Sequence, residues 1–468
     1  MQATRRSFFK TAMSLGVASS AYPLLTACSA EGEADTGAAK TMDLQTDPNG
    51  LLDLPPGFTY TQLSVAGEVM DDGLRVPTSH DGMTTFPIEG DADRCLLIRN
   101  HEMSADDQDE GPFAGMTSVS DDIRDKAYDI DANGLPLPAG TTTLVFNMKT
   151  QQIEKSWMSL VGTIRNCSGG ITPWGSWLTC EETLQKADDN ISKDHGYVFE
   201  VPSSARGLVK AEPLKAMGRF NHEATATDPR TGIVYQTEDA HDSLIYRFLP
   251  AAKGELHKGG RLQVLALKDR PRADTRNWYN PGTYRMGERW AVEWLDIDGI
   301  DAPDNDLRLR GHAKGAALFA RGEGMCLAVE KTGNAIYFAC TSGGEAECGQ
   351  IWKYTPGDFE GTSDEASAPG MLTLVVESTN ASEMEMCDNI VASPWGDLVV
   401  CEDGPDDEFV RGVTPEGRIY TIARNAHPDQ AEFAGACFAP DGETLFVNTQ
   451  GPHATYAIRG PWAKIARA

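Results

Sequence analysis

One short phrase occurs twice in this chain, at two widely separated places. The first copy covers residues 172–182 and reads TPWGSWLTCEE, and the second covers residues 393–403 and reads SPWGDLVVCED. Each copy begins with a Pro-Trp-Gly turn, continues as a short apolar strand and ends in two carboxylates. A phrase that returns in this way indicates an architecture of repeated units. Such units would deliver acidic side chains to a common place, where hard cations can bind.

Looser copies of the phrase occur elsewhere in the chain. Their turns, strands and polar ends lie at residues 95–102, 230–239, 331–342 and 441–450. Each unit also has a cluster of small and polar residues before its turn, at residues 80–83, 166–170, 221–224, 321–325, 386–389 and 433–437. A cluster, a strand, a Gly-marked turn and a second strand are typical of a β-hairpin.

Hairpin-based sheets around an axis predict an all-β fold, a β-propeller with irregular loops and few short helices. Six blades are expected rather than seven, because the sequence holds six such phrases. The alternative is a β-sandwich or two smaller β domains, because turn–strand phrases occur in every β protein. The propeller is predicted to form a single catalytic domain over residues 50–468.

The composition limits the class of partner. The chain has a formal net charge of −28, which argues against nucleic acid because nucleic-acid binding needs a basic surface. An acidic balance also suits bound multivalent cations, although it can serve solubility alone. The protein is expected to be a monomer.

The cysteines do not predict a disulfide framework. Ten cysteines are too few and too scattered for one in a chain of 468 residues. Cys340 and Cys348 could form a bridge, and Cys180 and Cys401 are expected to be small buried apolar residues. Cys167 is unusual because it lies inside a polar, Gly-rich cluster.

The N-terminus has the features of an export signal. Residues 4–10, TRRSFFK, form a twin-arginine signal, and the apolar stretch that follows is too short for a membrane span. Residues 1–28 are predicted to be this signal, with a lipobox-like end at which Cys28 would carry a lipid; ordinary cleavage near Ala30 is the alternative. Residues 29–49 are predicted to be a flexible acidic tether. The protein is therefore expected in the periplasm or cell envelope, with membrane contact only through that lipid.

The repeat would gather many polar side chains, most of them acidic, at one end of the axis. They are Asn100, Glu102, Cys167, Glu181, Glu182, Glu223, Glu238, Asp239, Glu323, Asp388, Glu402 and Asp403. Burial of these carboxylates without counter-charges costs roughly several kcal/mol of free energy per ion, and bound metal ions would offset that cost. Oxygen ligands favour calcium, magnesium or manganese, whereas a thiolate at Cys167 favours a transition metal such as iron. His101 and His222 are further candidates, and Glu182, Asp239 and Asp403 are the most open to solvent in this prediction.

Arg321 is the candidate substrate-binding cation. It lies two residues before Glu323, so strand alternation would place both side chains on one face. An arginine beside metal-bound oxygens can hold a phosphate with two hydrogen bonds, and a structural salt bridge is the alternative. The sequence contains no G-x-S-x-G elbow, Walker loop, H-E-x-x-H or EF-hand loop.

These motifs together resemble the PhoX-type alkaline phosphatases. The resemblance lies in the phrase at 166–182, in His222-Glu223, in the run 321–325 and in Asp388-Asn389, and it extends from about residue 50 to 450. It implies a propeller phosphatase with an oxo-bridged iron (Fe³⁺) and calcium cluster on its axis. The chain is shorter than family members commonly are, which leaves outer calcium sites and the substrate range open.

The resemblance also implies roles for single residues. Cys167 would bind iron, Arg321 would bind phosphate, and Glu223, Glu323 and Asp388 would bridge metals. Asn100, Glu102, Glu182 and Glu402 complete the predicted metal ligands, and Cys167, Arg321 and Glu323 the predicted catalytic residues. The expected activity is metal-dependent hydrolysis of phosphate monoesters outside the cytoplasm, with no side-chain nucleophile. The expected partner is a small phosphate-ester substrate. The alternatives are a calcium-dependent propeller esterase or lactonase and a non-catalytic envelope propeller.

Overall fold

The computed structural model describes residues 43–465. The predicted signal segment, the lipidation site at Cys28 and most of the predicted tether lie outside the described residues. The end of the tether is held in place, since the Asp47 carboxylate accepts hydrogen bonds from the amides of Leu51 and Leu52 and from the Tyr60 hydroxyl. Among the described residues, no helix is both long and apolar enough to cross a membrane.

Antiparallel hydrogen bonding joins the strands into five sheets. The first contains β3 (His80–Ile88), β4 (Asp91–His101), β5 (Ala139–Asn147) and β6 (Gln152–Thr163), and the second contains β7 (Asn166–Ile171), β8 (Ser176–Glu181) and β9 (Val198–Pro202). The third contains β10 (His222–Thr227), β11 (Val234–Glu238), β12 (Tyr246–Pro250), β13 (Gly260–Leu267), β14 (Arg289–Asp296), β18 (Met371–Glu377), β17 (Gln350–Thr355), β16 (Gly333–Cys340) and β15 (Gly322–Glu330).

The N-terminal strands complete the last two sheets. The fourth sheet contains β19 (Cys387–Ala392), β20 (Leu398–Glu402), β21 (Phe409–Val413), β22 (Ile419–Asn425) and β1 (Leu52–Asp53). The fifth contains β23 (Phe433–Phe438), β24 (Thr444–Thr449), β25 (Ala454–Arg459) and β2 (Thr59–Val65). Pairing of β1 with β22 and of β2 with β25 therefore ties the beginning of the described chain to its end.

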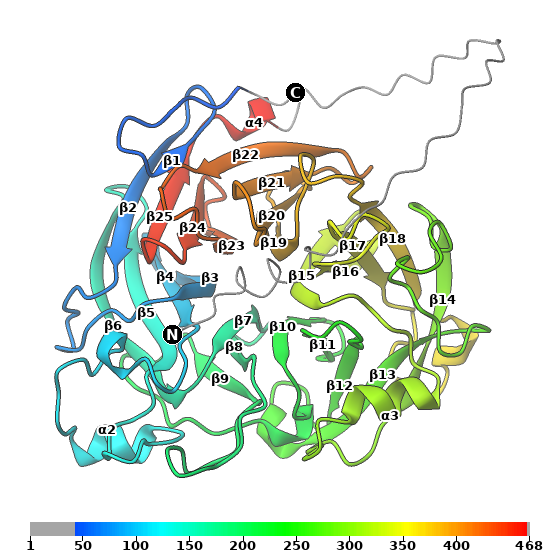
Figure 1. The fold of residues 1–468 in the computed structure, drawn as a ribbon, viewed down its shortest axis with the longest axis horizontal. Coiled ribbons are helices and arrows are strands. Elements are labelled where there is room, and N and C mark those ends of the chain that lie inside the picture. Colours follow the sequence, from blue (N-terminus) through cyan, green and yellow to red (C-terminus); the bar gives the residue numbers. More distant parts are fainter. Residues whose placement is uncertain (1–42, 466–468) are drawn as a thin grey trace, which may run out of the picture. The chain divides into compact units, whose positions relative to one another are not determined.

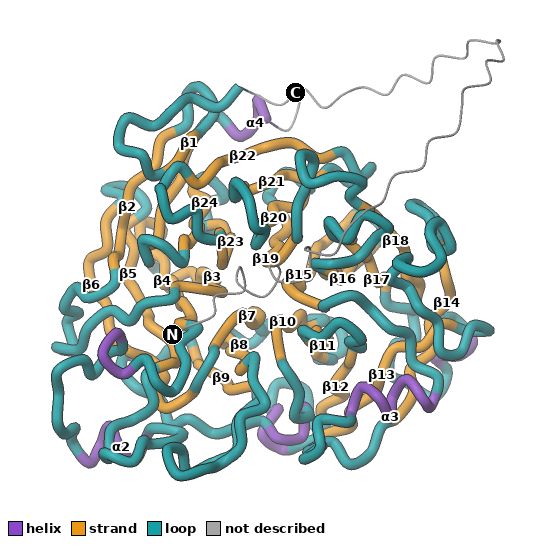
Figure 2. Tube along the Cα trace, in the orientation of Figure 1, coloured by secondary structure: helices purple, strands orange, loops and turns teal. Residues whose placement is uncertain are grey.

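The first strands of the predicted hairpin units surround the centre of the fold (Figure 1). Strands β3, β7, β10, β15, β19 and β23 contact one another in that order, and β23 contacts β3 again. The helices α2 (Asp121–Lys126), α3 (Leu307–Lys314) and α4 (Trp462–Ile465) are short and lie away from the centre, in the connections (Figure 2). The prediction of an all-β, propeller-like fold with few helices is confirmed. The hydrogen bonding does not divide the fold clearly into six blades, because one sheet has nine strands.

Apolar clusters fill the spaces between successive hairpin units. Between the first and fifth sheets, for example, Phe146 packs edge-on against Phe446 with ring centroids 4.9 Å apart. Cys180 and Cys401 lie in such clusters, as expected. All the described cysteines are free thiols, so the bridge considered between Cys340 and Cys348 is not formed.

Every one of these first strands carries a β-bulge near its start. The pairing shifts between His80 and Met83 in β3, and equivalent shifts occur in β7, β10, β15, β19 and β23. The first bulged residues are Asp81, Cys167, Glu223, Glu323, Asp388 and Gly435. A bulge leaves one residue out of the ladder and re-aims its side chain. The same local device therefore places a predicted ligand residue in four of these strands, and Asp81 in a fifth.

Glycines next to the bulges let neighbouring strands approach closely. A Cβ on Gly324 would lie 2.6 Å from the carbonyl oxygen of Asp388 and 2.7 Å from the Cα of Asn389. Gly324→Ala must push backbone apart, and we expect it to lower the free energy of unfolding by about 1–3 kcal/mol. Urea unfolding measures this cost. Gly207→Ala is the matched control, because nothing lies within 4 Å of the added atom; equal effects of the two substitutions would contradict the close-packing argument.

Candidate metal centre

A continuous series of ligand-type side chains lies at the starts of the bulged strands. It consists of four overlapping groups: Asp81, Glu102 and Cys167; Cys167, Glu182 and Glu223; Glu223, Glu323 and Asp388; Asp388, Asp403 and Glu432. Within each group the ligand atoms all lie within 4.8 Å of one another. Because neighbouring groups share Cys167, Glu223 or Asp388, the series passes from β3 through β7, β10 and β15 to β19.

Two positions of the repeat supply nearly all of this series. The first is the bulged residue of the first strand. The second is the residue directly after the second strand, which is Glu102 after β4, Glu182 after β8 and Asp403 after β20. Asp239 holds the same position after β11. The repeat therefore marks ligand positions in most of the units, and the hairpin geometry brings the two kinds of position together.

Cys167 and Glu223 are in close contact within the series. The Cys167 Sγ lies 3.0 Å from the Glu223 Oε1 and 3.7 Å from the Asp81 Oδ2. Burial raises the pKa of the Cys167 thiol well above its ordinary value, and the carboxylates of Asp81 and Glu223 raise it further. Burial, followed by the Glu323 carboxylate, likewise raises the pKa of Glu223. Without cations, this cluster of like charges would hold protons instead.

The donor set fits metal ions. Glu223 Oε2 is buried and has no hydrogen-bond partner among the described residues, so one carboxylate oxygen in the middle of the series is left for a ligand from outside the chain. A buried polar atom in this state costs free energy unless something binds it. One sulfur among many carboxylate oxygens suits a transition metal at one end and oxygen-preferring cations elsewhere.

Arg321 lies against the series on the β15 side. Its Nε and Nη2 donate to the two carboxylate oxygens of Asp239 at 2.8 and 3.0 Å, and Nη2 also donates to the Glu323 Oε1 at 2.6 Å. Its backbone φ of 55° is in the left-handed region, which few residues with side chains adopt. Arg321 thus forms the contacts that the salt-bridge alternative describes, and its role in phosphate binding stays a prediction. The same contacts hold its guanidinium beside the carboxylate groups.

Arg165 is a second arginine at the equivalent position, and sequence reasoning missed it. It precedes Cys167 by two residues, as Arg321 precedes Glu323, and its φ is 51°. Its Nη2 contacts the carboxylates of Glu102 and Glu182, the latter at 2.5 Å. The side chain of Arg165 is 34% exposed and that of Arg321 is 10% exposed. The shared spacing from a bulged residue was the signal that could have identified Arg165.

Two predicted ligands lie apart from the series. Glu402 points into its own sheet, where Oε1 accepts from the Arg411 Nε at 2.8 Å and from the Glu385 amide at 2.9 Å. Asn100 donates to the backbone oxygens of Cys167 and Ser168 and accepts from the Trp177 indole at 2.8 Å. Asn100 thus holds the backbone of the Cys167 bulge in place through these two hydrogen bonds. Glu402 belongs to none of the groups, and the assignment of both residues as metal ligands stays a prediction.

Other members of the series were not predicted as ligands. Asp81 and Glu432 were absent from the predicted ligand set, and Asp403 was expected to be among the side chains most open to solvent; the structure places all three in the groups. Neither histidine candidate joins a group, because His101 Nδ1 donates to the Thr78 carbonyl and His222 Nε2 donates to the Gly218 carbonyl. Burial lowers the pKa of His222 to about 3.

The Glu181 carboxylate contacts a buried histidine and is not part of the series. His195 lies between two carboxylates, with Nδ1 2.6 Å from the Glu181 Oε1 and Nε2 3.3 Å from the Asp129 Oδ2. Burial alone would lower the pKa of His195, but Glu181 and Asp129 outweigh it and raise the pKa from 6.5 to about 9.

This histidine predicts a pH dependence of stability. Because the folded pKa lies above the unfolded one, the stabilisation is complete below pH 6.5 and is lost as pH rises through about 9. We expect a loss on the order of 3 kcal/mol across this interval. Urea unfolding at pH 6 and pH 9.5 should show the loss in the parent protein and little of it in His195→Gln. Identical pH profiles would contradict the ion-paired state of His195.

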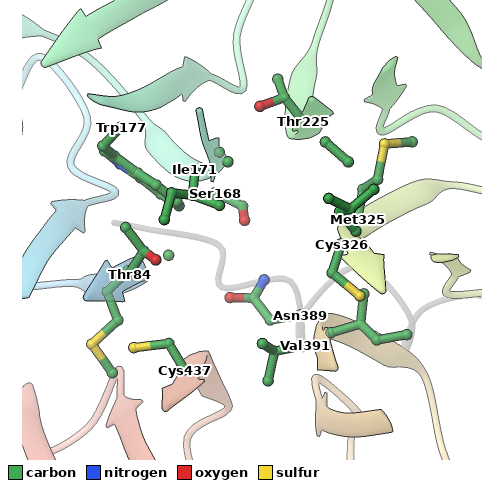
Figure 3. Close-up of a pocket in the computed structure, with 18 of the residues that line it drawn as sticks. Thr84, Ser168, Ile171, Trp177, Thr225, Met325, Cys326, Asn389, Val391 and Cys437 are labelled. Carbon is green, nitrogen blue, oxygen red and sulfur yellow. The ribbon is translucent and has the colours of Figure 1, made fainter. Parts of the chain in front are cut away.

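A separate cavity of about 300 Å³ lies further along the same inner strands. Its lining includes Ser168, Thr225, Met325, Asn389 and Val391, which follow the bulged residues along their strands (Figure 3). No member of the carboxylate series lines it. The cavity has neither paired carboxylates nor a cation, so we place the chemistry at the series.

The comparison with protein families decides the class of this centre. The profile of the family described as alkaline phosphatase PhoX matches residues 39–453, which is most of the chain. The chain belongs to this family. This PhoX-family chain is accordingly a metal-dependent phosphatase, a hydrolase of phosphoric monoesters, and not the lactonase or non-catalytic propeller of the alternatives. No curated protein sequence matches it significantly.

A solved structure from the same family shows the same fold. The Pseudomonas fluorescens PhoX in complex with vanadate, a transition state analogue, is 19% identical, with a TM-score of 0.61 over 88% of this chain and 96% of that chain. A gluconolactonase from Xanthomonas campestris is 10% identical, with a TM-score of 0.38 over 87% of this chain and 99% of that chain.

Proposed function

We propose that the carboxylate–thiolate series holds iron and calcium and is the phosphomonoesterase centre of this PhoX-family chain. The observation that carries the proposal is the Cys167 Sγ lying 3.0 Å from Glu223 in a buried cluster of carboxylates. A single sulfur favours iron at the groups that contain Cys167, and the all-oxygen group of Asp388, Asp403 and Glu432 favours calcium. When bound, such ions polarise phosphoryl oxygens and make a neighbouring water more acidic.

The residues of the chain would bind and orient the substrate. Arg321 would donate to an oxygen of the phosphoryl group, while Asp239 and Glu323 hold its guanidinium in a fixed plane. Arg165, at the equivalent position on the Cys167 side, would keep Glu102 and Glu182 aligned for the ions. In the vanadate complex of the P. fluorescens protein a transition state analogue is bound; we expect vanadate to inhibit this chain competitively through Arg321.

The finer points of architecture and location belong to the same proposal. We count six blades, with the nine-stranded sheet regarded as two blades joined through β14 and β18. The protein would leave the cytoplasm by the twin-arginine route and function as a monomer in the periplasm or envelope, anchored through Cys28 if that residue is lipidated. Residues 1–28 carry this part of the proposal by sequence alone.

The test combines elemental analysis with a phosphate-release assay on purified protein. We expect both iron and calcium to co-purify, and release of phosphate from p-nitrophenyl phosphate to fall in parallel with loss of either metal on chelation. Protein without iron that hydrolyses the ester at full rate would overturn the iron assignment. Hydrolysis of lactones without phosphate release would overturn the activity.

A further inference from the structure

Three arginines are among the largest fully buried side chains, and one of them, Arg99, has fewer hydrogen-bond partners than the other two. Arg99 is 0% exposed, and Arg219 and Arg247 are each 1% exposed. A buried guanidinium normally requires an acceptor for its N–H groups and a counter-charge, because both the unpaired donors and the unpaired charge are costly. The comparison within one chain therefore shows what Arg99 lacks.

Arg219 and Arg247 each donate to several acceptors, and Arg247 also has carboxylate partners. Arg219 Nε donates to the His195 carbonyl at 2.7 Å, and its Nη2 donates to the Leu184 carbonyl at 2.9 Å. Arg247 is held by the carboxylates of Glu360 and Glu365 and by the Gln263 side chain. Arg99 can therefore be compared with these two residues in the number of its hydrogen-bond acceptors.

Arg99 makes a single side-chain hydrogen bond. Its Nη1 donates to the Thr455 hydroxyl at 2.6 Å, while Nε and Nη2 have no acceptor among the described residues. No carboxylate in the described part of the chain forms an ion pair with Arg99, although the protein carries an excess of 28 negative charges. Burial lowers the pKa of Arg99 to about 9, so its charge persists at neutral pH.

The polar neighbours of Arg99 in the described part of the chain do not supply an acceptor for Nε or Nη2. Arg99 lies on β4 opposite Thr142 of β5, and it reaches Thr455 of β25 in the fifth sheet, next to the first (Figure 1). The Thr455 hydroxyl already donates to the Asn448 Oδ1 at 2.6 Å. The Thr142 hydroxyl contacts His101 Nε2 at 3.0 Å, and because His101 Nδ1 must donate to the Thr78 carbonyl, Nε2 is the acceptor of that bond.

A second buried atom close by also lacks a partner. The rings of His80 and His101 pack edge-on with centroids 5.1 Å apart, and His80 Nδ1 has no hydrogen-bond partner among the described residues. His80 Nε2 donates to the Pro77 carbonyl, so the ring is satisfied as a neutral imidazole on that side only. Unpartnered donors and an unpartnered acceptor in one interior region indicate a small ligand from outside the chain together with its water.

We propose that Arg99 binds a small monovalent anion, such as a halide or formate-sized carboxylate, between the first and fifth sheets. The two free donors Nε and Nη2 lie on one edge of the guanidinium, which is the edge that takes an anion side by side. The single unpaired charge matches one negative charge. The anion would neutralise the interface across which the first and last hairpin units meet, and this role is separate from phosphate hydrolysis at the carboxylate series.

Crystals of the full metal-loaded protein soaked in bromide test the site directly. We expect an anomalous bromine peak within hydrogen-bonding distance of Arg99 Nε and Nη2, and a parallel soak in formate shows whether a planar oxyanion replaces it. Bromide or formate at this place supports the proposal. Ordinary water alone beside both nitrogens, in both soaks, overturns it.

Thermal unfolding gives an independent readout in solution. Replacing gluconate by bromide at constant ionic strength should raise the Tm of the parent protein by about 3 °C relative to Arg99→Met, since a ligand that binds only the folded state stabilises it. The matched control is Arg94→Met on the same strand, where the arginine is solvent-accessible and paired with Glu154. The control should keep the full bromide response. The same bromide response in Arg99→Met as in the parent contradicts the proposal.

Discussion

Cys167→Ala should abolish phosphate release and remove iron from the protein while the fold persists. The thiol is the one sulfur in the carboxylate series and contacts Glu223 at 3.0 Å, so its loss leaves oxygen ligands that bind iron less selectively. We expect kcat to fall by at least about 10²–10³-fold, the loss typical when a preorganised electrostatic group is removed. Iron content by elemental analysis and phosphate release from p-nitrophenyl phosphate measure the two effects.

The matched control for this substitution is Cys180→Ala. Cys180 lies on β8 of the same sheet, is equally buried, and packs in an apolar cluster away from the carboxylates. The control loses the same atoms and should keep iron and activity, with a modest decrease in Tm. Full turnover by Cys167→Ala, or equal losses of activity in the two variants, would show that the sulfur does not serve the metal centre.

Arg321→Met should lower kcat/KM by about 10³-fold while the metals stay bound. An arginine that stabilises the charge of a transferring phosphoryl group commonly contributes an effect of this size. The loss should appear in kcat and in the affinity for vanadate, because both report binding of the transition state. Arg321→Lys should recover little, since an ammonium cannot reproduce the two-pronged geometry that Asp239 now accepts.

A control arginine separates this role from general damage to ion pairs. Arg276 forms a two-pronged pair with Asp274 through Nε and Nη2, both at 2.7 Å, outside the carboxylate series. Arg276→Met should leave turnover and metal content unchanged. If Arg321→Met lost its metals as well as its activity, the arginine would be a support for Asp239 and Glu323 and not a substrate-binding residue.

The repeated phrase predicted the β class and the gathering of acidic residues, because hairpin units repeat their geometry as well as their sequence. It could not predict which carboxylate of each terminal pair faces the centre. Side chains alternate along a strand, so a shift of one residue reverses the side on which each lies. The structure shows that the second member joins the series in Glu181-Glu182 and Glu402-Asp403, while the first members pair with His195 and Arg411.

The bulges explain the remaining misses. Asp81 lies at the bulge of β3 as Cys167 does in β7, but the β4 phrase after it is the weakest copy in the sequence, which hid the equivalence. Glu432 precedes β23 and reaches Asp388 and Asp403 from a unit whose bulged residue is Gly435, so no repeat position marks it. Bulges depend on hydrogen-bond register between strands, and the sequence carries little direct trace of that register.

Anomalous diffraction at the iron absorption edge, on crystals of the purified protein, tests the central claim most directly. The account predicts an iron peak within bonding distance of Cys167 Sγ and the Glu223 carboxylate, with oxygen-coordinated calcium further along the series near Asp388. The absence of any metal at Cys167, in protein that still releases phosphate at full rate, would contradict it.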